Sequence, residues 1–346
     1  MKLRLIGLSW TVFLWVHAEE PGERLLERGN ELYQERRFAE AILIYQKAMV
    51  SEGNKALCLF NLGNCYYQTK QVGKAIKAYR QTIRLAPQFV RPYLNLAGLY
   101  FSFSQYGEAI VYYKKAVALD PQNYTLYLFL GESYRQCGEY ASALQILENA
   151  RQGSPQDYNI YYMIAEIYVE LKDFESAEEV IQEGIWHNPE NADLYFFLGD
   201  LSLMNQHYES AIVHYRRGLE LEPRRNEIYR RLADAAVQTG HLFVAIRILE
   251  EELALFPEDG EGYFELGNIH FEMGSMENSL KFYEQASQLK NSQAKNGLRN
   301  VAYYYYNLGD WVRTAEIYKK ILEYFPLDEK ALADFKELEE DHPVKF

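Results

Sequence analysis

The chain has 346 residues and a formal net charge of −13, with 48% hydrophobic and 25% charged residues. This balance is typical of a folded chain and excludes global disorder. The acidic excess argues against unspecific nucleic-acid binding, because that binding needs clustered lysine and arginine to displace counterions from phosphates.

Residues 1–18 have the pattern of a secretory signal peptide. Lys2 and Arg4 form a basic start, residues 5–16 are a mostly apolar run, and compact residues precede an expected cleavage after Ala18. As a helix the run reaches about 18 Å, short of the ~30 Å hydrocarbon core of a membrane. We therefore expect export and no stable membrane insertion after cleavage. A periplasm is the preferred location, and a secreted or lumenal location is the alternative. An uncleaved anchor is the alternative.

Beyond the signal, three series of residues recur every 34 positions in one phase. The members are Pro87, Pro121, Pro155, Pro189, Pro223 and Pro257; Gly29, Gly63, Ala97, Gly131, Ala165, Gly199, Ala233 and Gly267; and Ala41, Ala75, Ala109, Ala143, Ala177, Ala211, Ala245 and Ser279. Length alone suggests two domains, but such a period indicates a solenoid that grows by stacking units.

Each unit is predicted to be two helices. In residues 124–157, apolar residues fall at helical spacing on both sides of Gly138, which marks the turn, and Pro155 ends the second helix. Small residues at unit positions 8 and 20 allow the helices to cross closely, while tyrosine or leucine at positions 11 and 24 fills the space beside them. Many of the 30 tyrosines lie at these two positions, Tyr79 and Tyr113 among them, and are therefore expected to pack in the core.

Residues 56–89 match the tetratricopeptide repeat motif position by position, so the chain resembles that family. The matching residues are Leu62, Gly63, Tyr66, Ala75, Tyr79 and Pro87. The resemblance implies an all-α fold, a right-handed α-solenoid superhelix of about nine helical hairpins with a C-terminal capping helix. The expected repeats are residues 22–55, 56–89, 90–123, 124–157, 158–191, 192–225, 226–259, 260–293 and 295–328, and the capping helix is residues 329–342.

Three cysteines, too few for a disulfide framework, are expected to be buried, inert thiols. Cys58 and Cys65 are seven residues apart on one expected helix, roughly 10.5 Å along its axis. That separation is beyond disulfide reach, and Cys137 lies two repeats away.

The resemblance also implies a concave groove, lined by the first helices, in which family members bind extended peptides or partner helices. Asparagines and aromatic residues form its first predicted group: Asn30, Tyr33, Phe60, Asn61, Asn64, Tyr67, Arg91, Asn95 and Phe101. An asparagine amide both donates and accepts, so it can bind a peptide main chain whatever the side chains are. The alternative is that Asn61 and Asn95 bridge neighbouring helices.

Carboxylates form the second predicted group: Glu132, Glu166, Glu170, Asp200 and Asp234. A row of one charge focuses the field and attracts the opposite charge, so this group predicts a preference for basic peptide segments. The alternatives are neutralisation by Arg135, Arg230 and Arg231, or a solvated face.

Aromatic residues and asparagines near the C-terminal end form the third predicted group: Phe264, Asn268, Phe271, Asn300, Tyr303 and Tyr306. Such a patch is a candidate hot spot for a partner. It also suits a glycan or another small ligand, which would make the protein a recognition module of a different class.

Nothing in the sequence indicates catalysis, a metal site or a cofactor. The histidines are scattered singly, no glycine-rich phosphate loop appears, and no nucleophile has a base in a suitable context. The leading prediction is an exported, non-catalytic scaffold that binds a protein or peptide, for example in an envelope or secretion complex. Chaperone-like holding of unfolded clients and glycan recognition are the alternatives, and self-association stays open.

Overall fold

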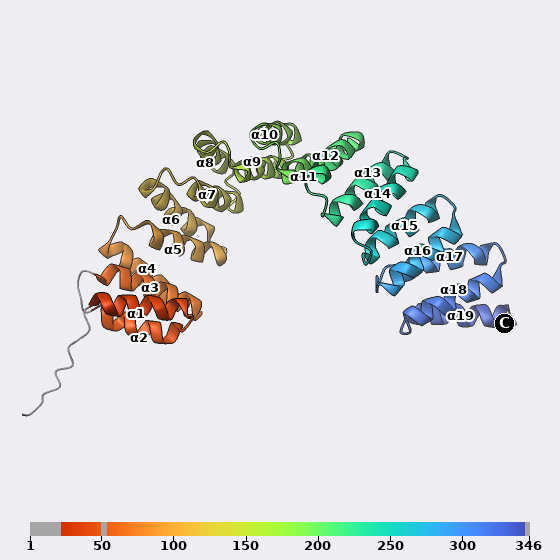
Figure 1. The fold of residues 1–346 in the computed structure, drawn as a ribbon, viewed down its shortest axis with the longest axis horizontal. Coiled ribbons are helices and arrows are strands. Elements are labelled where there is room, and N and C mark those ends of the chain that lie inside the picture. Colours follow the sequence, from red (N-terminus) through yellow and green to blue (C-terminus); the bar gives the residue numbers. More distant parts are fainter. Residues whose placement is uncertain (1–21, 50–53, 343–346) are drawn as a thin grey trace, which may run out of the picture. The chain divides into compact units, whose positions relative to one another are not determined.

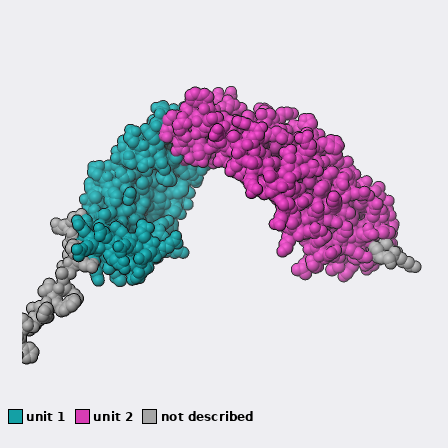
Figure 2. All heavy atoms as spheres, viewed as in Figure 1, with its two compact units in different colours: residues 1–153 teal, residues 154–346 magenta. Residues whose placement is uncertain are grey.

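The computed structural model describes residues 22–49 and 54–342, so the predicted signal peptide lies outside the described residues. Within this part of the chain every regular element is a helix, and successive helices pack as hairpins (Figure 1). The chain forms two compact units, unit 1 up to Gly153 and unit 2 from Ser154 (Figure 2). Each unit is a stack of helical hairpins, which is the predicted all-α solenoid architecture.

Unit 1 contains four consecutive hairpins in its described residues. Its helices are α1 (Gly22–Gln34), α2 (Phe38–Ala48), α3 (Lys55–Gln68), α4 (Val72–Leu85), α5 (Val90–Ser102), α6 (Tyr106–Leu119), α7 (Thr125–Gln136) and α8 (Tyr140–Gly153). The first helices of these hairpins are therefore α1, α3, α5 and α7, and α1 also contacts α3 directly.

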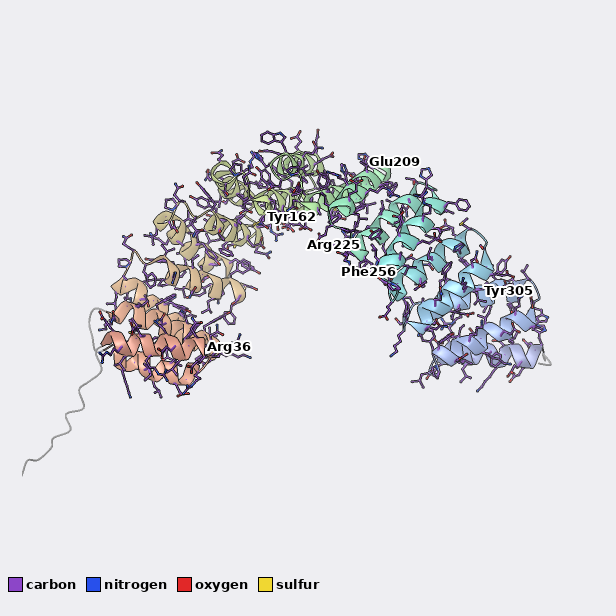
Figure 3. All side chains as sticks on the ribbon, viewed as in Figure 1. Arg36, Tyr162, Glu209, Arg225, Phe256 and Tyr305 are labelled. Atoms are coloured by element: carbon purple, nitrogen blue, oxygen red, sulfur yellow. The ribbon has the colours of Figure 1, made fainter. Side chains whose placement is uncertain are left out.

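Unit 2 continues the pattern with five hairpins and a final single helix. Its helices are α9 (Tyr158–Glu170), α10 (Phe174–His187), α11 (Ala192–Met204), α12 (Tyr208–Leu221), α13 (Asn226–Gln238), α14 (Leu242–Leu255), α15 (Gly260–Glu272), α16 (Met276–Gln288), α17 (Ala294–Asn307), α18 (Trp311–Tyr324) and α19 (Glu329–Asp341). Figure 3 shows Tyr162 of the first helix α9 and Glu209 of the second helix α12 on opposite sides of this unit.

Glycine allows the two helices of a hairpin to cross closely, as the small-residue series predicts. A Cβ added to Gly29 would lie 2.5 Å from the ring of Tyr45, and one on Gly63 would lie 2.5 Å from the ring of Tyr79. Both tyrosines are buried. The tyrosine ring therefore fills the space that the missing side chain leaves, and this pairing fixes the hairpin geometry.

The turn inside each hairpin uses a residue in the left-handed backbone conformation. Gly138 has φ of +75°, and the equivalent turns of other hairpins place Lys70 (φ +59°) and Lys172 (φ +62°) in the same region. That conformation is costly for a residue with a Cβ. The repeat therefore imposes the turn geometry even where the sequence does not supply glycine.

The cysteines follow the prediction only in part. Cys58 and Cys65 are free and buried, and burial raises the pKa of Cys65 to about 12, so its thiol stays protonated. Cys137 is exposed, which corrects the expectation of a buried thiol. The reason is its place at the end of α7, beside the hairpin turn, where the chain faces solvent.

The final helix α19 is anchored by the buried side chain of Asp328. Its two carboxylate oxygens each accept a hydrogen bond from Arg299 at 2.8 Å, and Lys295 lies 3.2 Å away. The backbone N–H of Ala331 donates to the same carboxylate and so caps α19. Burial raises the pKa of Asp328, but the bonds from Ala331, Lys295 and Arg299 outweigh this and lower it.

No described helix is long and apolar enough to cross a membrane.

Candidate functional site

The predicted asparagines of unit 1 form bridges between successive hairpins. Asn30 Oδ1 accepts hydrogen bonds from the Tyr45 hydroxyl (2.8 Å) and from Asn61 Nδ2 (2.9 Å). One hairpin later, Asn64 Oδ1 accepts from the equivalent tyrosine of α4 (2.8 Å) and from Asn95 Nδ2 (2.7 Å). Each of these amides therefore has a structural role. A ligand could bind only to the amide donors and acceptors that these bridges do not use.

A pocket of about 600 Å³ lies on the first-helix side of unit 1, and we call it the unit-1 pocket. It is lined by Tyr33, Asn64, Tyr67, Gln68, Tyr79, Leu94, Asn95, Gly98, Leu99, Tyr113 and Phe129. The predicted group contributes Tyr33, Asn64, Tyr67 and Asn95 from α1, α3 and α5. The pocket thus brings together residues from all four hairpins of the unit.

The walls of the unit-1 pocket are uncharged. Aromatic rings and two leucines supply apolar surface, while amides and tyrosine hydroxyls supply hydrogen-bonding groups. Tyr67 and Phe129 are 48% and 47% exposed, so both rings present apolar surface at the pocket. Such a surface suits an uncharged ligand with apolar groups and amide-like polar atoms.

Other members of the first predicted group lie elsewhere. Phe60 is buried, and its ring lies 5.0 Å from that of Phe89, so it belongs to the packing between hairpins. The ring of Phe101 packs edge-on against Tyr106 at 5.2 Å. Arg91 is exposed and outside the lining of the unit-1 pocket.

Basic residues neutralise part of the predicted acidic row. Asp200 is bound through both carboxylate oxygens by Arg231 from the next hairpin, at 2.5 Å. In unit 1, Glu132 pairs with Arg135 on its own helix at 2.7 Å. Asp234 is exposed and accepts a hydrogen bond from the side chain of a glutamine one turn later.

Glu166 is half-buried and Glu170 is exposed, both on α9. With Asp200 they belong to unit 2, whereas Glu132 belongs to unit 1. A pocket of about 410 Å³ in unit 2 contains Asp200 together with Arg231 and Arg225, among other residues. Its lining has both charges, so the field there is weaker than a row of carboxylates alone would produce.

The third predicted group divides between packing and surface. Phe264 and Phe271 pack against the core of the last hairpins, and Asn268 accepts a hydrogen bond from the Tyr283 hydroxyl at 2.7 Å. Asn300, Tyr303 and Tyr306 instead line a pocket of about 420 Å³ between α17 and α19, which we call the end pocket. Its other lining residues are Arg299, Tyr318, Lys330, Asp334, Glu337, Leu338 and Asp341.

Sequence reasoning missed Gly98, Tyr113 and Phe129 in the unit-1 pocket. Tyr113 was assigned to the core from its repeat position, and it is indeed only 5% exposed. Phe129 occupies the sixth position of its repeat and Gly98 the ninth, which are the positions of predicted asparagines in the neighbouring repeats. The available signal was Gly98 itself, because the ninth position holds Asn30 and Asn64 in the two preceding repeats and an acidic residue in each of the four following ones.

No group of three or more histidine, cysteine, aspartate or glutamate side chains in residues 22–49 and 54–342 is arranged to hold a metal ion. The described clefts are lined by aromatic, amide and ionic groups.

Stacked hairpins with a 34-residue period place the chain among the α-solenoid repeat proteins. The model of a single tetratricopeptide repeat matches residues 56–89, and the model of the Cilia and flagella-associated protein 70 C-terminal domain matches residues 89–300, more than half of the chain. The chain therefore belongs to the tetratricopeptide repeat family, in the group of that C-terminal domain. No curated protein matches the sequence.

One of the similar solved structures supports this fold, and two others are similar over a smaller share of the chain. The C-terminal part of a tetratricopeptide repeat protein from Cytophaga hutchinsonii superposes with a TM-score of 0.56 at 18% identity, covering 69% of this chain and 98% of that one. MamA gives 0.42 at 22% identity, over 48% of this chain and 90% of its own. YrrB, described as having an unusual peptide-binding site, gives 0.41 at 20% identity, over 54% and 95%.

Proposed function

We propose that the chain is a non-catalytic scaffold that binds an uncharged, partly apolar polypeptide segment in the unit-1 pocket. The observation that carries this proposal is the lining of that pocket, which exposes Tyr67 and Phe129 beside amide groups and has no charged side chain. Exposed aromatic rings in a concave surface are typical anchors of protein interfaces. A pre-formed groove also reduces the ordering cost on its own side.

The hydrogen-bonding capacity of the pocket supports a main chain as the ligand. Asn64 and Asn95 each use part of their amide in bridges between hairpins, which fixes the orientation of the amides before any ligand arrives. A fixed amide pairs well with the peptide groups of an extended segment.

Selection of peptides against the purified full chain tests this proposal. A displayed random-peptide library should yield uncharged sequences with aromatic or aliphatic residues, and calorimetry should give their dissociation constants. We expect Tyr67→Ala and Phe129→Ala each to weaken binding by roughly tenfold or more. The matched control is Phe243→Ala, because Phe243 is 75% exposed but lies on the second helix α14. Equal affinity in all three variants would contradict the proposal.

The acidic residues of unit 2 support a second, narrower proposal, a preference for basic segments there. It rests on the number of carboxylates that unit 2 contributes to the predicted row, which are Glu166, Glu170, Asp200 and Asp234. Affinity for a basic peptide that falls steeply with added salt would favour this site, whereas binding in the unit-1 pocket should change little.

Export belongs to the same proposal and rests on residues 1–18 of the sequence. A mature protein whose first residue is Glu19, identified by mass spectrometry of its N-terminal peptide, would support delivery to a periplasm and a role in an envelope or secretion complex. An intact Met1 in the mature protein would oppose cleavage.

Two alternative functions make different predictions. Holding of unfolded clients predicts suppression of client aggregation, and glycan recognition predicts saccharide binding that is lost in Tyr303→Ala and Tyr306→Ala. Either result would replace the proposal of a scaffold.

A further inference from the structure

At one position of the second helix, the hydroxyl of a buried tyrosine repeatedly has a partner on the facing helix. In four hairpins the tyrosine at the same position of the second helix donates to a side-chain oxygen at the same position of the first helix. The pairs are Tyr45 with Asn30, Tyr79 with Asn64, Tyr215 with Asp200, and Tyr283 with Asn268, at 2.5 to 2.8 Å. The acceptor in each case satisfies a hydroxyl that burial would otherwise leave without a hydrogen bond.

The hairpin of α5 and α6 breaks this arrangement at Tyr113. The position of the acceptor is occupied by Gly98, and a Cβ built there would lie 3.6 Å from the Tyr113 hydroxyl oxygen. In the preceding hairpins the acceptor asparagine also receives a hydrogen bond from Asn61 or Asn95 of the next hairpin. Here the equivalent residue of the next hairpin is Phe129, and its ring stacks on Tyr113 with centroids 5.7 Å apart. Among the described residues no group forms a hydrogen bond with the Tyr113 hydroxyl.

Packing between the helices does not explain the glycine. At Gly63 an added Cβ would lie 2.5 Å from a tyrosine ring, so that glycine is required by the close approach. At Gly98 the nearest atom is at an ordinary contact distance, and glycine in a helix interior lowers helix stability relative to alanine. Gly98 therefore leaves open space at the floor of the unit-1 pocket, beside a polar group without a partner.

We propose that the Tyr113 hydroxyl donates a hydrogen bond to a main-chain carbonyl oxygen of the bound polypeptide segment, which occupies the space above Gly98. This inference rests on the proposed function and specifies its central contact. Tyr113 is only 5% exposed, yet its side chain lines the pocket. The ligand thus supplies the acceptor that Asn30 and Asn64 supply in the two preceding hairpins.

The chemistry of the pocket selects a neutral acceptor. Burial raises the pKa of Tyr113 to about 12, so the hydroxyl keeps its proton at neutral pH and can donate. No charged side chain lines the pocket to balance a carboxylate on the ligand. A peptide carbonyl flanked by apolar side chains satisfies the hydroxyl, lies against Leu94 and Leu99, and brings no charge.

Removal of the hydroxyl tests the contact with the peptides selected above. We expect Tyr113→Phe to weaken peptide binding by roughly fivefold to tenfold and to leave the thermal midpoint unchanged, because the hydroxyl has no partner in the free chain. The matched control is Tyr45→Phe, whose hydroxyl is bonded to Asn30 outside the pocket. It should lower the thermal midpoint and leave the affinity within twofold. Equal peptide affinity in wild type and Tyr113→Phe overturns the inference.

Restoring the missing acceptor gives the opposite signature. In Gly98→Asn the new amide oxygen should accept from Tyr113 as Asn64 accepts from Tyr79, so the thermal midpoint should rise while peptide binding weakens more than tenfold. Unchanged affinity in Gly98→Asn overturns the inference even if the variant is more stable. A variant that unfolds is uninformative about binding, and for that reason Tyr113→Phe, which only removes an oxygen, decides the question.

Ester substitution identifies the main-chain carbonyl itself. An ester carbonyl is a weaker hydrogen-bond acceptor than an amide carbonyl, so we replace each peptide bond of the ligand by an ester in turn. At one position the ester should weaken binding to the wild type. The same ester should not weaken binding to Tyr113→Phe. Equal losses in both chains overturn the assignment to a main-chain carbonyl. If Tyr67→Ala also has no effect, the proposed function fails; if Tyr67→Ala weakens binding and Tyr113→Phe does not, only this inference fails.

Discussion

The carboxylate of Glu252 in α14 is fully buried, and neither of its oxygens accepts a hydrogen bond from the described residues. Arg230 Nε is the nearest cationic nitrogen, 3.8 Å from Oε1. Burial, which Arg230 opposes and Asp259 and Glu265 reinforce, raises the pKa of Glu252 to about 8. The carboxyl group therefore carries a proton in the folded chain at neutral pH.

This raised pKa makes stability depend on pH. Between about pH 4.5 and pH 8 the folded chain holds a proton on Glu252 that the unfolded chain has lost, so the free energy of unfolding falls as pH rises through that window. We expect a loss of roughly 3 kcal/mol between pH 5 and pH 8.5, measured by urea unfolding followed by circular dichroism. Glu252→Gln should remove most of this loss. An equal pH dependence in both chains would contradict the assignment.

The role of a residue could be predicted from the sequence when its contacts lie within its own repeat. The position of Asn61 on a first helix was correctly recognised, but its bond to Asn30 comes from the neighbouring hairpin, and sequence alone could not separate this bridge from a ligand contact. Tyr113 illustrates the opposite case. Its core position was evident, whereas the loss of its partner required the facing residues to be seen together.

Individual helices are determined by spacing and by close glycine contacts. The 34-residue period placed a turn at Gly138, and the structure has left-handed backbone there. It could not predict that Lys70 and Lys172 adopt the same conformation, because their side chains favour helix and give no turn signal. Neighbouring elements impose that geometry on these residues.

A pair of glycines in adjacent helices tests how a hairpin is held. Gly63→Ala places a methyl group 2.5 Å from the Tyr79 ring, so we expect the free energy of unfolding to fall by about 1–3 kcal/mol. Gly73 in α4 has no atom within 4 Å of an added Cβ, so Gly73→Ala should be neutral or stabilise by about 0.5 kcal/mol. Chemical unfolding of both variants measures the difference, and equal effects would show that close helix crossing is not what Gly63 provides.

On the scale of the whole chain, an acidic protein contains a pocket with an uncharged lining. The net charge is −13, yet the lining of the unit-1 pocket has no charged side chain. The acidic surface thus discourages unspecific association with nucleic acid, while we expect the pocket itself to select uncharged segments. The fold was predictable because the period is long and regular; the neutral pocket was not, since it depends on which rings stay exposed between hairpins.

Hydrogen–deuterium exchange of the full chain, with and without a selected peptide, tests the location of binding most directly. The account predicts that the peptide protects amides in the first helices α3, α5 and α7 of unit 1, around Tyr67, Gly98 and Phe129, and leaves the second helix α14 around Phe243 unchanged. Protection confined to unit 2, or to second helices, would contradict it.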